Sequence, residues 1–311
     1  MNKLLTHYSQ PLFLFLMLSL IIIFLSVNAP SFLTSQNILN VIEANNYRLI
    51  LAIGMTFIMA SGVMDLSAGA MVSFCGVIMA VALHQGSSVV TAVSAGLVTG
   101  VLLGTINGML IHYTKINFFI LTLATCGIFR GMGLMITQGK PITALGSSFI
   151  QLGIGRLGGM QLSTWLTLAL LAIAYPLLFK TTWGTYISGL GGNKDALEKS
   201  GIRSGRYRIG VQAFFGLLAA LTALIITARL NSAEPNAGMN MELEAITAVV
   251  MGGTPITGGK ASLIGTVAAV LILGFIRNGL TLMSISSDYQ QWITGFLLLA
   301  SVLITEIRIR R

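Results

Sequence analysis

The sequence predicts an all-α protein that crosses a membrane about ten times, and three observations support this prediction. Hydrophobic residues make up 55% of the 311 residues and charged residues only 9%, against about 25% charged in an average soluble domain. The apolar residues come in runs long enough to cross a hydrocarbon core about 30 Å thick. Basic residues outnumber acidic ones by 18 to 9, and they gather in alternate loops. Together these observations exclude a soluble enzyme and a disordered chain.

The apolar runs define ten predicted spans, and the pattern allows eight to eleven. In order, they cover residues 12–27, 47–63, 67–84, 89–112, 117–137, 162–179, 209–230, 244–257, 261–283 and 289–305. We interpret the first as an uncleaved span, because Pro30 blocks the small-residue cleavage site before it and the rest of the chain is equally apolar. The run 244–257 is short and ends in glycines, so a re-entrant segment is the alternative there. The stretch 38–46 predicts a partial helix before the second span.

The basic residues fall mostly on one side when the spans alternate from a cytoplasmic N-terminus. Those that then face the cytoplasm are Lys3, Lys115, Lys180, Lys194, Lys199, Arg203, Arg206, Arg208, Lys260, Arg308, Arg310 and Arg311. The remainder, which lie outside, near the outer boundary or within spans, are Lys140, Arg156, Arg48, Arg229, Arg130 and Arg277. This distribution is the positive-inside bias of membrane proteins, and it predicts that both termini are cytoplasmic.

The fourth predicted span carries a glycine at every fourth position, at Gly96, Gly100, Gly104 and Gly108. Lipid provides no hydrophobic reason for helices to associate, so close backbone approach between small residues must hold them together. The stripe therefore predicts tight helix packing within the chain, and a subunit interface is the alternative.

Two glycine-rich segments resemble nucleotide-binding motifs, and neither fits its motif. Residues 153–158 match GxGxxG by letter, but no strand precedes them and they lie in a predicted outward loop. Residues 253–261 are one residue too long for a phosphate loop, and Ala261 stands where Mg²⁺ needs a Ser or Thr. Cys75 and Cys126 lie inside apolar runs, and no disulfide or metal-ligand spacing is seen. We therefore expect neither a nucleotide nor a metal site, and no covalent catalysis, in this chain.

The loop 180–208 holds eight of the 27 charged residues of the chain. Within it, Asn193 is a suitable helix N-cap, Asp195 falls in the first turn and Lys199 in the last, and Gly201 is placed for a left-handed helix end. A helix of two turns is marginal alone in water. We therefore expect a short surface helix that docks a cytoplasmic partner, with a solvated connector and a lipid-surface helix as alternatives.

Several ordered blocks of sequence are typical of one transporter family. The first block is Gly54-Met-Thr with Met64-Asp-Leu-Ser-Ala-Gly, and the second is Lys115-Ile-Asn-Phe-Phe-Ile-Leu-Thr-Leu-Ala-Thr with Arg130-Gly131. The third is Gly191-Gly-Asn with Ser200-Gly-Ile202. The last is Ala228-Arg-Leu-Asn-Ser-Ala-Glu-Pro with Glu244-Ala-Ile-Thr-Ala-Val-Val-Met-Gly-Gly-Thr and Gly258-Gly-Lys260. On these blocks, most of the chain resembles the membrane permeases of ribose-, xylose- and arabinose-type ABC importers, which are related to branched-chain amino acid permeases. The last block looks closest to the ribose members.

The resemblance implies a single transmembrane permease domain, residues 1–311, in the bacterial inner membrane, with residues 180–208 as a cytoplasmic coupling loop. It also implies a second permease copy, identical or paralogous, a cytoplasmic ABC ATPase that binds ATP and Mg, and a periplasmic sugar-binding protein. The chain itself would bind no cofactor and no nucleic acid. The expected ATPase-coupling residues are Gly192, Asn193, Ala196, Leu197, Ser200, Gly201 and Ile202. Glu234 and Glu242, in an outward loop without basic residues, are candidates for docking the binding protein, the alternative being a solvated loop.

Polar residues within or beside the spans are the candidates for a translocation pathway. They are Asp65, Ser67, Asn107, Thr122, Arg130 and Asn278. Asp65 has a second interpretation, as the carboxylate that caps the N-terminus of the third span. Arg130 either extends toward the outer interface or pairs inside the bundle, and Arg277 and Asn278 leave the same choice open. A pathway needs only weak hydrogen bonds, because the cargo must leave again.

The expected cargo is a monosaccharide, with ribose first. Autoinducer-2, nucleosides and branched-chain amino acids are alternatives for the same architecture. A different class, an ion-coupled secondary transporter, would need a buried carboxylate relay or an inverted repeat with paired broken helices. The sequence offers one candidate carboxylate, Asp65, and no evident repeat.

Overall fold

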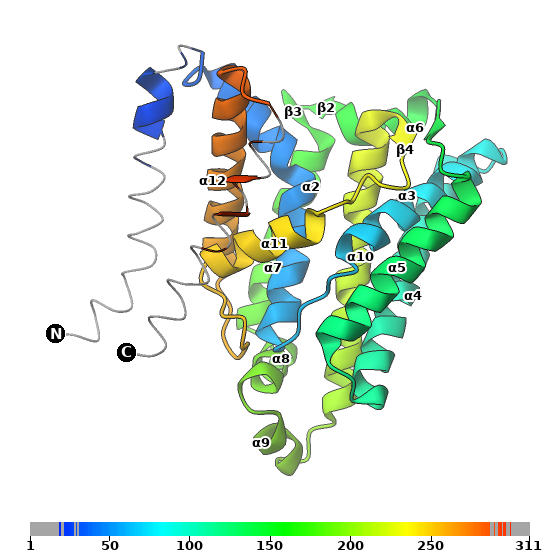
Figure 1. Cartoon of the computed structure of the whole chain (residues 1–311), viewed down its shortest axis with the longest axis vertical. Coiled ribbons are helices and arrows are strands. Elements are labelled where there is room, and N and C mark those ends of the chain that lie inside the picture. The colour runs from blue at the N-terminus through cyan, green and yellow to red at the C-terminus, as the bar shows by residue number, and fades with distance from the viewer. Residues whose placement is uncertain are drawn as a thin grey trace.

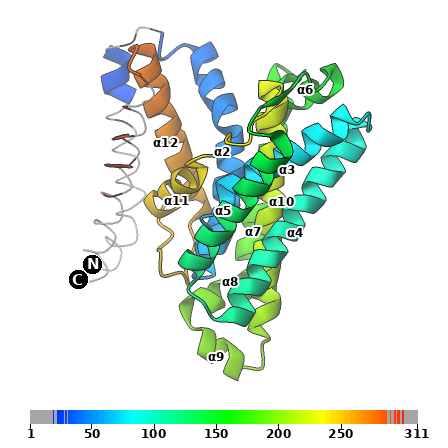
Figure 2. The same ribbon diagram turned by 45° about the vertical axis from the view of Figure 1, so that its right-hand side comes forward.

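The computed structural model describes residues 31–286 without a gap, together with residues 19, 22–27, 29, 289, 292–293, 295–296 and 299. The predicted first and last spans, 12–27 and 289–305, therefore lie mostly outside the described residues, as do both chain ends and their basic residues. The described part is almost entirely helical, and most of its helices stand side by side along the long axis of the molecule (Figures 1 and 2).

The helices and strands follow one another in a simple order. They are α2 (Ser35–Ala60), α3 (Ala68–His84), α4 (Val89–Thr114), α5 (Phe118–Thr137), β1 (Ile142–Thr143), α6 (Ser147–Ile154), β2 (Arg156–Leu157), β3 (Met160–Gln161), α7 (Leu162–Phe179), α8 (Thr182–Gly192), α9 (Lys194–Lys199), α10 (Ser204–Leu230), β4 (Ser232–Ala233), α11 (Met241–Met251) and α12 (Leu263–Leu282). The two-residue strands pair antiparallel, β1 with β4 and β2 with β3.

Five of the described helices, α4, α5, α7, α10 and α12, are long and apolar enough to cross a membrane. We name the end that carries α8 and α9 the lower end, and the end that carries α6 and the strands the upper end (Figure 1). The predicted cytoplasmic loops around residues 115 and 180–208 lie at the lower end. The predicted outward loops with Arg156 and Glu234 lie at the upper end. The alternation of spans agrees with the charge pattern.

The second predicted span, 47–63, belongs to a longer helix than its apolar run indicates. Helix α2 begins at Ser35, where the side chain of Thr34 accepts a hydrogen bond from the backbone N–H of Asn37. The stretch 38–46 is therefore the first part of the same helix rather than a separate one. Two of its buried polar side chains are paired with other elements: Glu43, as described below, and Asn46, whose Nδ2 donates to the hydroxyls of Ser163 and Thr164 on α7. This pairing offsets the cost of burying them.

Helices α3 and α11 are too short to cross by themselves. Helix α2 ends near the lower end, and residues 61–67 then rise without helix until α3 starts halfway up the molecule (Figure 1). Helix α11 lies obliquely at the same height, and the chain continues below it to Gly259, whose N–H donates to the carbonyl oxygen of Ala60 at 3.0 Å. The chain from β4 to Gly259 thus leads from the upper to the lower end, and the segment predicted as 244–257 forms the lower part of this passage rather than turning back as a re-entrant segment would.

The glycine stripe of α4 packs against α10 within the chain. A Cβ atom placed on Gly100 would lie 2.3 Å from the carbonyl oxygen of Gly216, and one on Gly104 would lie 2.1 Å from that of Gln212. Both distances are far shorter than a van der Waals contact, so no side chain fits at these two positions. The backbones of α4 and α10 therefore pack directly on each other. The predicted helix packing within the chain is confirmed.

Candidate functional site

The starts of α3 and α11 meet halfway along the molecule. A Cβ atom on Gly69 would lie 1.9 Å from the carbonyl oxygen of Gly238, and one on Gly238 would lie 2.0 Å from that of Gly69. The N–H of Gly238 also donates to the hydroxyl of Ser73 in α3 at 2.9 Å. Two helix N-termini, each carrying partial positive charge, are therefore brought together with no room for a side chain at their junction.

A buried polar network fills the entrance to α3. The Oδ1 atom of Asp65 accepts hydrogen bonds from the backbone N–H of Ser67 at 2.8 Å and from its hydroxyl at 2.6 Å. The Nδ2 atom of Asn107, on α4, donates to Oδ2 of Asp65 at 3.0 Å and to the hydroxyl of Ser67 at 2.9 Å. Of the two interpretations of Asp65, the structure shows the carboxylate at the N-terminus of a helix, where the helix dipole and these donors offset its burial.

Glu242 lies at the same junction, in the first turn of α11. Its Oε2 atom would be 2.4 Å from a Cβ atom on Gly69, so the carboxylate contacts the first turn of α3. This position corrects the expectation that Glu242 lies in an outward loop, because the chain has already descended to half height before α11 begins. Glu234, in contrast, is exposed near the upper end after β4, and docking of a binding protein there stays a prediction.

Arg130 extends from α5 toward this junction. Its guanidinium interacts electrostatically with Glu242, and its Nε atom is buried without a hydrogen-bond partner among the described residues, as is Oε2 of Glu242. No ion pair of Arg130 is formed among the described residues, so the choice between its two interpretations stays a prediction. Unsatisfied buried donors and acceptors are costly.

The remaining two pathway candidates already use hydrogen-bonding groups within the protein. The hydroxyl of Thr122 donates to the carbonyl oxygen of Phe118 at 2.8 Å in its own helix. The side-chain amides of Asn278 and Asn37 exchange two hydrogen bonds, of 2.8 and 2.9 Å, between α12 and α2. Neither residue is joined by a hydrogen bond to the network of Asp65, Ser67 and Asn107.

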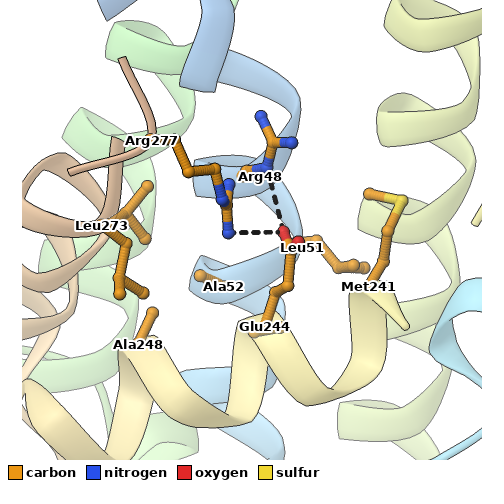
Figure 3. A pocket seen from close by; sticks show the side chains of 10 residues that line it. Arg48, Leu51, Ala52, Met241, Glu244, Ala248, Leu273 and Arg277 are labelled. Carbon is orange, nitrogen blue, oxygen red and sulfur yellow. Dashed lines mark hydrogen bonds and ion pairs between the residues drawn. The ribbon is translucent and has the colours of Figure 1, made fainter. Parts of the chain in front are cut away.

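A second charged cluster lies above α11 and was missed in the sequence. The Oε2 atom of Glu244 accepts a hydrogen bond from Nε of Arg48 at 2.9 Å and pairs with Nη2 of Arg277 at 3.0 Å. Figure 3 shows Glu244 rising from α11 between Arg48 on α2 and Arg277 on α12. Nη1 of Arg277 is buried without a hydrogen-bond partner within the described part of the chain.

This cluster closes a small pocket whose walls include Leu51, Ala52, Ala248 and Leu273. The free volume is about 10 Å³, roughly the space of one water molecule. Glu244 therefore joins three helices in the upper half of the molecule. The signal in the sequence was that Arg48 and Arg277 lie beside or within apolar runs, where a charged side chain needs a partner of opposite charge.

At the lower end, the short helix predicted within the loop 180–208 is present as α9. The side chain of its N-cap, Asn193, accepts a hydrogen bond from the N–H of Ala196 at 2.9 Å. Gly201 has a φ of +81° and ends the helix in the left-handed region, as predicted. Ser200, whose hydroxyl donates back to the carbonyl oxygen of Ala196, and Gly192 are exposed.

Contacts on one side hold α9 against the bundle. Leu197 packs on α8, with Cδ1 3.1 Å from where a Cβ atom on Gly189 would be. Ile202 is half-buried, and its N–H donates to the carbonyl oxygen of Leu197 at 3.3 Å. The hydroxyl of Ser204 donates to the Glu198 carboxylate, and this hydrogen bond, together with nearby Lys194, lowers the pKa of that carboxyl.

An aromatic cluster connects α8 to the core. The rings of Phe57 on α2, Trp183 on α8 and Phe214 on α10 have centroids 5.0 to 5.8 Å apart. Pairs at these separations stabilise beyond their simple burial. Helix α8 is therefore fixed to the two helices around which the rest of the bundle packs.

Comparisons with known proteins agree with these features. The family described as "Branched-chain amino acid transport system / permease component" matches residues 37–302. The ribose import permease protein RbsC of Bacillus subtilis is 41% identical over 93% of this chain and 91% of its own length. RbsC of Escherichia coli K12 is 36% identical over 92% and 91%. The L-arabinose transport system permease protein AraH of Escherichia coli K12 is 37% identical over 89% and 85%. No solved structure gives a significant match.

Proposed function

The chain belongs to the family of branched-chain amino acid transport system permease components, and from this premise we propose that it carries ribose across the bacterial inner membrane as a permease subunit of an ABC importer. The observation that carries the proposal is the identity of 36% to 41%, over nearly the whole chain, with proteins named as ribose import permeases. The chain is a multi-pass membrane protein of a transport family. The arabinose permease relatives support a pentose as the class of cargo.

Energy would come from a separate ATPase that binds ATP and Mg. Of the two glycine-rich segments, residues 253–261 are the one that resembles a phosphate loop, and their backbone is packed against the end of α2. A Cβ atom on Gly258 would lie 2.5 Å from the Cα atom of Gly62. The N–H of Gly259 donates to the carbonyl oxygen of Ala60. A phosphate loop needs free backbone N–H groups around the anion, whereas this loop packs its backbone on α2.

The same backbone contacts offer a route from the ATPase to the centre of the bundle. A Cβ atom on Gly191, at the end of α8, would lie 2.2 Å from the carbonyl oxygen of Ala60 and 2.8 Å from the N–H nitrogen of Gly62. Gly62 begins the non-helical segment that leads to Asp65 and the start of α3. If the ATPase displaces α9 and α8, the close backbone contact at Gly191 would move the non-helical segment that begins at Gly62. That segment leads to the start of α3, so the junction of α3 and α11 would move with it.

The junction supplies the groups that a neutral sugar needs. Nε of Arg130 is a donor without a partner among the described residues, and Oδ1 of Asn107 and Oε2 of Glu242 are acceptors without one. Such groups bind hydroxyls weakly one at a time, which suits a pathway from which the cargo must leave. We further propose that a second permease copy and a periplasmic binding protein complete the importer, with Glu234 on the side that the binding protein would face.

Reconstitution into liposomes tests the proposal. The chain, its cognate ATPase and its binding protein should together take up labelled ribose when ATP is supplied. Omitting the ATPase or ATP should abolish uptake, and unlabelled arabinose or leucine should compete less well than ribose. Uptake by the chain alone, driven by an ion gradient, would establish a secondary transporter instead. Preferential uptake of leucine or arabinose would keep the importer and change its cargo.

A further inference from the structure

A cationic cavity of about 340 Å³ opens at the lower end, between the α4–α5 connection and the helices α8, α9 and α10. Its charged lining residues are Lys115, Lys194 and Arg208, with His112 beside them. No carboxylate is among the lining residues. The cavity is separate from the pocket of Glu244 and from the junction of α3 and α11.

Arg208 is the cation in this cavity that most needs a counter-charge. Its Nη1 atom donates to the carbonyl oxygen of Ser61 at 2.9 Å and to its hydroxyl at 3.0 Å. Both partners are neutral, and Arg208 forms no ion pair among the described residues. A desolvated charge without an opposite charge is unfavourable, and a bound anion would remove this cost.

Neighbouring acidic groups do not neutralise the cavity. Glu198 is the nearby carboxylate, and it lies 3.7 Å from Nζ of Lys194. The same Oε1 atom already accepts a hydrogen bond from the hydroxyl of Ser204. Lys115 has no ion-pair partner in the described part of the chain. At least two permanent positive charges therefore remain uncompensated around one solvent-accessible space.

The apolar part of the lining indicates what kind of anion fits. Ile111, Ile116 and Phe118 form one side of the cavity. The outer face of α5 continues this surface with Phe119 and Ile120, which are 48% and 63% exposed. A headgroup phosphate placed among the cations would thus have its acyl chains beside an apolar helix face, at the end of the molecule that meets the cytoplasmic leaflet.

We propose that this cavity binds a phosphate anion, and that its source is the headgroup of an anionic glycerophospholipid of the inner leaflet. Basic pockets between helices on the cytoplasmic side suit such headgroups. The inference rests on the orientation of the chain in the membrane and not on the cargo. A bound lipid would bridge α4, α9 and α10 and so hold the coupling helix against the bundle.

Lipid titration of the purified full-length chain in a neutral detergent tests this proposal. Short-chain phosphatidylglycerol, short-chain phosphatidylcholine and inorganic phosphate are the probes. Native mass spectrometry counts bound molecules, and the shift of the thermal unfolding midpoint gives the affinity. We expect phosphatidylglycerol to bind saturably with one molecule at this site and phosphatidylcholine to bind at least about tenfold more weakly, since its headgroup carries no net charge.

The informative variant combines Lys115→Asn with Lys194→Gln. Both side chains are exposed, and Asn tolerates the left-handed backbone at residue 115, whose φ is +56°, so the fold should survive. Each interfacial cation contributes roughly fivefold to binding of an anionic lipid, so the double variant should bind phosphatidylglycerol about 30-fold more weakly. The matched control combines Lys180→Gln with Lys199→Gln, which removes the same charge from exposed positions outside the lining and should lose less than about threefold.

The outcomes separate the sources of the anion. Binding of inorganic phosphate with the same dependence on residues 115 and 194, without binding of phosphatidylglycerol, would keep the phosphate site and replace the lipid by a soluble phosphate. Equal losses in both double variants would overturn the proposal, because general surface charge would then explain the binding. A double variant that binds phosphatidylglycerol normally and binds the ATPase poorly would also overturn it, by assigning the cavity to an acidic side chain of the ATPase.

Discussion

The two ends of the molecule treat their charges in opposite ways. In the upper half, Glu43 is 2% exposed and pairs with Arg156 at 2.9 Å, and Glu244, which rises from α11 near mid-height, pairs with Arg48 and Arg277. At the lower end, Lys115 and Arg208 have no carboxylate partner among the described residues. The positive-inside bias of the sequence thus corresponds to a real excess of uncompensated charge at one end.

The difference shows what each set of charges does. These pairs join elements far apart in the sequence: residue 48 in α2 to 244 in α11, and residue 156 in β2 to 43 in α2. A carboxylate paired with partly buried cations is stabilised by them, and removing one partner of such a pair is costly. At the lower end, Arg208 joins α10 to Ser61 through neutral partners only. The positive charges of Lys115 and Arg208 therefore stay free to meet headgroups or a partner protein. The paired charges therefore join parts of the fold, and the unpaired positive charges at the lower end are the ones to which we assign binding.

The largest effect should come from Glu244→Gln. The substitution keeps the size of the side chain but leaves Arg48 and Arg277 without a counter-charge, so the free energy of unfolding should fall by about 3 kcal/mol. Unfolding of the detergent-solubilised chain by heat or by a denaturing detergent measures this loss. The matched control, Glu234→Gln, removes an exposed carboxylate near the same end and should change stability by less than about 0.5 kcal/mol. Equal stability of the two variants would contradict the structural role of the pair.

Arg156→Gln should have the next largest effect. Glu43 would keep the hydrogen bond from the N–H of Gln161 at 3.1 Å and lose its positive partner. Because the Arg156 side chain is 46% exposed, solvent screens the pair, and the expected loss of unfolding free energy is about 1 to 2 kcal/mol. The same unfolding measurement on Lys140→Gln, an exposed cation at the same end, provides the control. A loss no greater than that of the control would place this pair with ordinary surface ion pairs.

Leu197→Asp should affect coupling more than stability. The substitution removes the apolar contact with α8 at Gly189, and Gly201→Pro disturbs the same helix end, because proline cannot adopt a φ of +81°. In the reconstituted importer, both variants should hydrolyse ATP while ribose uptake falls by about tenfold or more, since motion of α9 no longer reaches α8. Lys199→Gln, exposed on α9, should transport normally. Unchanged uptake in both variants would reduce α9 to a solvated connector.

Lys115→Asn should leave the stability of the fold nearly unchanged. Its side chain is exposed and forms no ion pair among the described residues, so the expected change is below about 0.5 kcal/mol in lipid-free detergent. Comparing this small change in unfolding free energy with the large loss expected from Glu244→Gln tests whether paired and unpaired charges contribute differently to the fold. A loss of similar size in both variants would mean that the lower cations also hold the fold together.

The smallest effect should be a pH dependence confined to α9. The pKa of Glu198 is lowered in the folded chain by the hydrogen bond from Ser204 and by Lys194. A lowered pKa stabilises the fold at pH values above the ordinary range of a glutamate, about 4.3, and this contribution is lost as the pH falls through the folded value. Amide hydrogen exchange in α9, corrected for intrinsic rates, should accelerate in that range. Glu198→Gln should show no such step, and a step retained in this variant would assign the titration to another group.

Much of the fold could be read from local sequence. Hydropathy located the interior spans, and the spacing of Gly96 to Gly108 predicted a close helix contact. The cap at Asn193 and the left-handed end at Gly201 were also predictable. Each of these features depends on neighbouring residues or on the preference of a side chain for lipid or water, and both are properties of a short window.

The candidate site depended far more on the tertiary structure. Asp65 and Asn107 were recognised as intramembrane polar residues, but their shared network forms only because α3 starts beside α4. Glu242 was placed in a loop, since hydropathy cannot show that the chain descends before its helix begins. The partnership of Glu244 with Arg48 and Arg277 was missed, although both arginines stood out.

By itself, the sequence determined the class of protein and its family, and it predicted the sidedness, because composition and ordered motifs record the solvent and the ancestry of a chain. Only the tertiary structure decided which helices begin halfway along the molecule and which charged side chains pair with each other. The physical reason is that inside a membrane the cost of a polar group is set by its partner. That partner is often more than a hundred residues away, as Glu43 is from Arg156.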